Sequence, residues 1–173
     1  MQPAPGKEIV SRSVIVVIMG IFTVMLLTKS VPWLPLLDNA NLLIHEAGHT
    51  FLAGFGDFIS TLGGTIVQIF IPILFLSYFA FQRQLFAAGF TVFWLGNNLI
   101  NVSVYIKDAR VMLLPIIGGG IHDWNYLLSK VGWLTQDKLI GGGVYFLGAV
   151  CVLAGLGICV YTWYWEVRKI FSR

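Results

Sequence analysis

The stretch Asn41-Leu-Leu-Ile-His-Glu-Ala-Gly-His-Thr50 places two histidines and a glutamate in an otherwise apolar segment. On a helix, residues four positions apart differ by about 40° around the axis, so His45 and His49 face the same way. Two imidazoles on one face, with Glu46 beside them, match the H-E-x-x-H zinc pattern. In that pattern the histidines bind the metal and the glutamate is the general base. The alternative is that both histidines are helix-packing residues satisfied by their neighbours.

The composition around this stretch is that of a membrane protein. Hydrophobic residues make up 57% of the 173 residues and charged residues 11%, whereas a soluble domain carries about 25% charged residues. We therefore predict an all-α, polytopic membrane helix bundle, multi-pass in a bacterial-type cell membrane. An ionisable side chain in a membrane helix costs roughly 2.5–3.5 kcal/mol, so three of them within five residues indicate a function. The net charge of +3 suits the lipid bilayer and argues against nucleic acid as a partner.

Long apolar segments predict four to five transmembrane helices in one domain, 13–173, after a flexible polar tail, 1–12. The expected spans are 13–27, 61–81, 85–105 and 139–165, with a shorter helix over 41–55 that carries the motif. Asp38 or Asn39 is expected to cap this shorter helix. Another short helix is expected over 125–133, after a glycine-rich turn.

A catalytic zinc site needs three protein ligands and an open position for water. The sequence has only three histidines, so the third ligand is either His122 or a carboxylate. Asp123 follows a glycine-rich turn and opens an apolar helix, where irregular backbone can line a cavity. Its alternative role is the N-cap of that helix. His122 is otherwise expected to orient a ligand or to stabilise the transition state.

Two further groups of polar residues have open roles. Asp108 either orients a ligand histidine or pairs with Arg110 at the surface. Asn97, Asn98 and Asn101 are weak candidates for substrate binding, and the alternative is hydrogen bonding between helices.

The second half of the candidate site resembles a known motif. The stretch Leu113-Leu-Pro-Ile-Ile-Gly-Gly-Gly-Ile-His-Asp-Trp-Asn-Tyr-Leu-Leu128 is similar to the second motif of the site-2 protease family of intramembrane zinc metalloproteases. In that family an N-x-x-P stretch leads to L-D-G, whose aspartate is the third zinc ligand. The resemblance covers about residues 41–128 and places Pro115 at the family proline and Asp123 at the ligand. This chain has His-Asp-Trp in place of Leu-Asp-Gly, and Met112 in place of the asparagine.

The resemblance implies a Zn²⁺-dependent endopeptidase that cleaves membrane protein substrates. His45 and His49 would then be metal ligands with Asp123. Glu46 would take a proton from the attacking water and pass it to the leaving amine.

Three other classes of protein use similar residues or a similar fold. A non-catalytic subunit of a larger membrane complex, with a metalloprotease-like fold, is the alternative function. A haem carrier using His45 or His49 with His122 gives no reason for Glu46. Membrane di-iron oxygenases, judged by their families, need many more histidines than the three present.

Overall fold

The computed structural model describes residues 5–28, 34–114 and 121–172, and no residue in these ranges belongs to a strand. The elements, in chain order, are α1 (Pro5–Thr28), α2 (Pro35–Phe51), the 3-10 helix η1 (Ala53–Phe55), α3 (Asp57–Phe81), α4 (Leu85–Asp108), α5 (Asp123–Lys130), the 3-10 helix η3 (Leu134–Gln136) and α6 (Asp137–Phe171). In the described part of the chain, four helices (α1, α3, α4 and α6) are long and apolar enough to cross a membrane. The predicted all-α membrane helix bundle is therefore confirmed.

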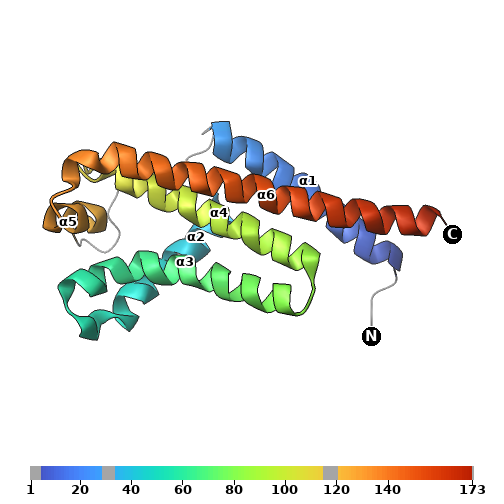
Figure 1. The fold of residues 1–173 in the computed structure, drawn as a ribbon, viewed down its shortest axis with the longest axis horizontal. Helices are drawn as coiled ribbons and strands as arrows, with labels where there is room; N and C mark the ends of the chain where they lie inside the picture. Colours follow the sequence, from blue (N-terminus) through green and yellow to red (C-terminus); the bar gives the residue numbers. More distant parts are fainter. Residues whose placement is uncertain (1–4, 29–33, 115–120, 173) are drawn as a thin grey trace.

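Three of the long helices, α3, α4 and α6, run back and forth along one axis (Figure 1). α3 and α4 form a hairpin, α6 returns antiparallel beside α4, and α1 crosses α6. The motif helix α2 is shorter, with 17 residues, and lies against α3. The short helix α5 lies at the end of the bundle where α4 ends and α6 begins.

Small residues let α4 and α6 approach closely. Each helix carries one every seven positions, which keeps them on one face: Gly89, Gly96 and Ser103 in α4, and Gly141, Gly148 and Gly155 in α6. A Cβ atom added at Gly96 would lie 2.6 Å from the backbone nitrogen of Val152. One added at Gly148 would lie 2.9 Å from the carbonyl oxygen of Gly96. Close backbone approach at small residues is how membrane helices gain packing energy when lipid offers no hydrophobic drive.

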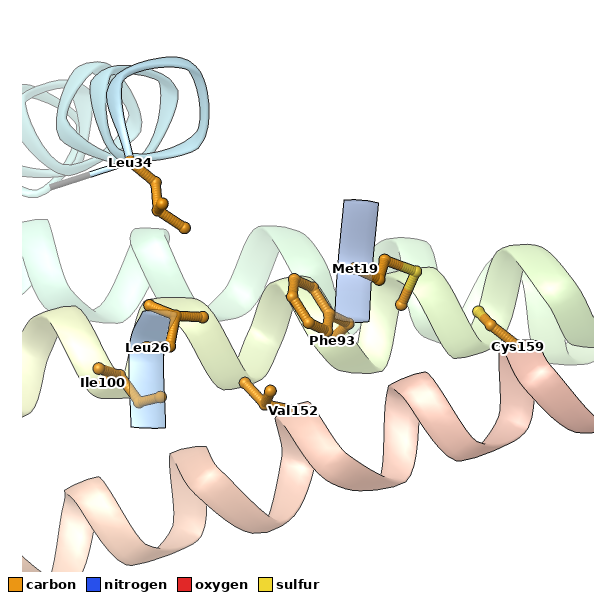
Figure 2. Packing of buried hydrophobic residues seen from close by; sticks show 7 residues of the cluster. All are labelled: Met19, Leu26, Leu34, Phe93, Ile100, Val152 and Cys159. Carbon is orange, nitrogen blue, oxygen red and sulfur yellow. The ribbon is translucent and has the colours of Figure 1, made fainter. Parts of the chain in front are cut away.

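An apolar cluster attaches α1 to this pair of helices (Figure 2). Its buried members come from α1, α4 and α6, with one residue preceding α2: Met19, Leu26, Leu34, Phe93, Ile100, Val152 and Cys159. Phe93, Val152 and Cys159 are at most 1% exposed, so the cluster forms a packed interior.

The amino-terminal segment differs from the prediction. α1 begins at Pro5, so residues 5–12 are helical, not a flexible tail. The cause is a set of ion pairs: Arg12 bonds to Glu8 one turn earlier, at 2.5 Å, and to Glu166 near the end of α6. Residues 1–4 lie outside the described part of the chain.

The motif helix also starts earlier than expected. α2 begins at Pro35, a residue whose missing N–H and fixed φ suit the first turn of a helix. Asp38 therefore lies inside the helix and is not its N-cap residue, and Asn39 lies there too. The carboxylate of Asp38 nevertheless accepts a hydrogen bond from the backbone N–H of Leu34, the N-cap residue, at 2.5 Å.

Candidate metal centre

Glycine contacts press the motif helix against α3. Gly48, inside the H-E-x-x-H turn, meets Gly63, where an added Cβ atom would lie 2.7 Å from the Gly48 carbonyl oxygen. The next residue, Gly64, lies under the ring of His45, and its added Cβ atom would be 2.5 Å from His45 Nε2. A side chain at Gly64 would therefore displace the imidazole, so the Gly63-Gly64 pair sets the position of the first histidine.

The structure brings together the three residues predicted to bind metal. Asp123 Oδ2 lies 3.0 Å from His45 Nε2 and 3.3 Å from His49 Nε2. In the described part of the chain these three residues form a group whose ligand atoms all lie within 4.8 Å of one another. The three side chains are partly buried, at 18–26% exposure, so the group lies at the wall of a cavity and keeps an open side.

Both histidines are held through their other ring nitrogen. His49 Nδ1 donates to the backbone carbonyl oxygen of Ser60 at 2.9 Å, and His45 Nδ1 lies 2.9 Å from Gln68 Oε1. A carbonyl oxygen only accepts, so in the neutral imidazole of His49 the proton is on Nδ1 and the lone pair is on Nε2. The Gln68 oxygen favours the same tautomer of His45. Two imidazole nitrogens and one carboxylate oxygen are a donor set that fits zinc, with acceptors behind the histidines as in known zinc sites.

The catalytic candidate lines the same cavity. Glu46, on the turn between the two histidines, borders a cavity of about 280 Å³ together with the three ligand candidates. This volume approaches that of small-ligand pockets, which begin at about 300 Å³. The cavity is therefore large enough for water and part of a peptide.

The N-cap of α5 is not Asp123. It is His122, whose Nδ1 accepts from the backbone N–H of Asn125 at 3.2 Å, so the capping role that was the alternative for Asp123 is wrong. Asp123 is the first residue of α5, and this shift of one position turns its carboxylate toward α2.

His122 is not part of the group of ligand atoms described above. It is 4% exposed, and its Nε2 lies 3.4 Å from Asp108 Oδ2. The Asp108 carboxylate also accepts from the backbone N–H groups of Leu113 and Leu114, at 3.1 and 3.0 Å. Asp108 therefore lies beside His122, next to the start of α5, and not beside His45 or His49.

The expected surface pair of Asp108 with Arg110 is wrong. Arg110 Nε lies 2.9 Å from Asp137 Oδ1, and Asp137 is fully buried at the start of α6. The position predicted for the family proline, Pro115, lies outside the described residues, as does the glycine run that follows it.

Two of the three asparagines of α4 form hydrogen bonds between helices. Asn97 Nδ2 and Asn101 Nδ2 donate to Asp38 Oδ1 in α2, at 3.0 and 2.6 Å. These donors stabilise a carboxylate that is only 3% exposed. Asn98 donates to the backbone of its own helix. Asn101 borders the cavity, whereas Asn97 and Asn98 are not among its lining residues.

Gln68 and Ser60 were not predicted to hold the histidines. The only local signal was an amide side chain in an apolar span, which indicates a buried polar partner but does not name it. Ser60 holds His49 through its backbone carbonyl oxygen, a group that every residue has, so the sequence gives no sign of this contact.

No protein-family model, curated protein or solved structure matches this chain. Its function is therefore inferred from the chemistry and geometry of the site.

The support given by Gln68 can be measured. Gln68→Ala is expected to lower zinc affinity about 10- to 100-fold, because His45 loses the acceptor that orients it. Gln68→Glu keeps an acceptor and should retain most of the affinity, and Gln82→Ala, at the exposed C-cap residue after α3, is the matched control. Competition with a chromophoric chelator in detergent gives the affinities. An unchanged zinc affinity of Gln68→Ala would show that Gln68 does not support metal binding.

Proposed function

We propose that this chain is a zinc metalloendopeptidase that hydrolyses peptide bonds of membrane-embedded protein substrates, in the manner of site-2 proteases. The observation that carries the proposal is the meeting of His45 and His49 with Asp123, which is 78 residues from His45 in the chain. Glu46 borders the same cavity, so the general base and the ligands share one space. We further propose that the protein is multi-pass and belongs to a bacterial-type cell membrane.

The residues of the cavity divide the chemistry between them. A bound zinc ion would lower the pKa of water toward about 7. Glu46 accepts a proton from the attacking water and delivers it to the leaving nitrogen. Gln68 and the Ser60 carbonyl keep the two imidazoles in the tautomer that offers Nε2. The backbone carbonyl groups of a helical substrate are already bonded within the helix, so the substrate must unwind locally.

Metal analysis tests this proposal directly. Purified protein in detergent is expected to carry one zinc ion per chain, and His49→Ala is expected to lose it, because the site then keeps only two ligands. Zinc is measured by mass spectrometry. Cleavage is measured with a fluorogenic transmembrane peptide, and it should stop on chelation and return when zinc is restored. Protein that binds no zinc, or binds it equally after His49→Ala, would contradict the proposal.

A further inference from the structure

One more residue on the motif face lines the cavity. Asn41 lies four residues before His45, so it occupies the same face of α2, about 6 Å along the helix axis. It is 2% exposed and borders the cavity that holds the ligand candidates. It is therefore close to the metal centre but one turn away from it.

The side-chain amide of Asn41 is held in one orientation. Trp94 Nε1, in α4, donates to Asn41 Oδ1 at 2.7 Å. An indole N–H can only donate, so the amide atom of Asn41 that faces Trp94 is the oxygen. The amide nitrogen, Nδ2, therefore lies on the side away from Trp94. Within the described part of the chain, this buried Nδ2 has no hydrogen-bond partner. A buried donor of this kind is unfavourable alone and is stabilised by an acceptor that enters the cavity.

A second group in the cavity has the same property. Thr65, in α3, is 6% exposed and lines the cavity, and its hydroxyl has no partner among the described residues. An amide N–H and a hydroxyl can both donate to a carbonyl oxygen. The cavity therefore presents donors beside the metal centre, and the backbone of a peptide supplies the matching acceptors.

We propose that Asn41 Nδ2 binds a backbone carbonyl oxygen of an extended substrate, about two residues from the bond that is cleaved. The spacing follows from the helix and the strand: about 6 Å on α2 corresponds to about two residues of extended chain, at about 3.3 Å each. The inference rests on the proposed function, because the distance is counted from the metal centre. A carbonyl group inside a helix already accepts from the helix backbone and is crowded by the neighbouring turn, so the site favours locally unwound segments whatever their side chains.

Two hydroxamates of different length test this role by binding alone. Acetohydroxamate reaches only the metal, whereas an N-acetyl dipeptide hydroxamate has the same metal-binding group and extends past Asn41. The double variant Asn41→Leu/Trp94→Phe removes both partners of the hydrogen bond, so that no new buried donor is created. In the zinc-loaded variant the dipeptide probe should bind about three- to tenfold more weakly, the worth of one hydrogen bond, while acetohydroxamate binds as before.

Further variants separate binding from general damage. Trp94→Phe alone leaves the Asn41 amide in place without its holder and should produce a smaller loss for the dipeptide probe. Thr91→Val changes a buried polar residue of α4 that does not line the cavity, and it should leave both affinities unchanged. Equal weakening of both probes by the double variant, or no weakening of the longer one, would overturn this inference alone. Wild-type protein that binds neither zinc nor acetohydroxamate would overturn the proposed function and this inference with it.

Discussion

Replacing Glu46 by glutamine is expected to lower the rate of peptide cleavage by about 10²- to 10⁴-fold while the protein keeps its zinc. An amide cannot take a proton from water at neutral pH, and general base catalysis is typically worth a factor of this size. The proposed ligand atoms belong to His45, His49 and Asp123, so the metal should stay. Cleavage of a fluorogenic transmembrane peptide in vesicles, with zinc analysis of the same sample, measures both effects.

A matched variant isolates the role of this carboxylate. Asp57→Asn makes the same change of carboxylate to amide at an exposed position, in the first turn of α3, and should leave the cleavage rate unchanged. Cleavage that survives Glu46→Gln would exclude the mechanism. Protein that copurifies with a larger membrane assembly and functions fully after Glu46→Gln would support the non-catalytic alternative.

The second large effect concerns two adjacent residues with different roles. Asp123→Ala is expected to weaken zinc binding by at least about 100-fold, because removal of a ligand costs more than the 10- to 100-fold typical of a supporting residue. His122→Ala should keep zinc binding within about tenfold of the wild-type value. It should instead destabilise the protein by about 1 kcal/mol, the usual value of a helix cap.

Chelator competition and thermal unfolding distinguish the two variants. The expected result is a loss of metal affinity for Asp123→Ala and a lowered unfolding temperature for His122→Ala. Loss of zinc by His122→Ala with retention by Asp123→Ala would reverse the assignment of the third ligand.

The sequence by itself determined the fold class and half of the candidate site. Apolar segments of spanning length are a local property, and the long helices follow from them. The common direction of His45 and His49 is equally local, because four-residue spacing sets it within a single helix. Both predictions depend on residues that are close in the chain.

Only the tertiary structure decided which partners these residues meet. His122 and Asp123 are neighbours in sequence, and the start of α5 places one at the cap and the other at the candidate metal centre. Asn97 could not be assigned to Asp38, 59 residues away, by any local pattern. The physical reason is that such contacts depend on how closely whole helices approach, and the contact of Gly48 with Gly63 sets that approach for the motif helix.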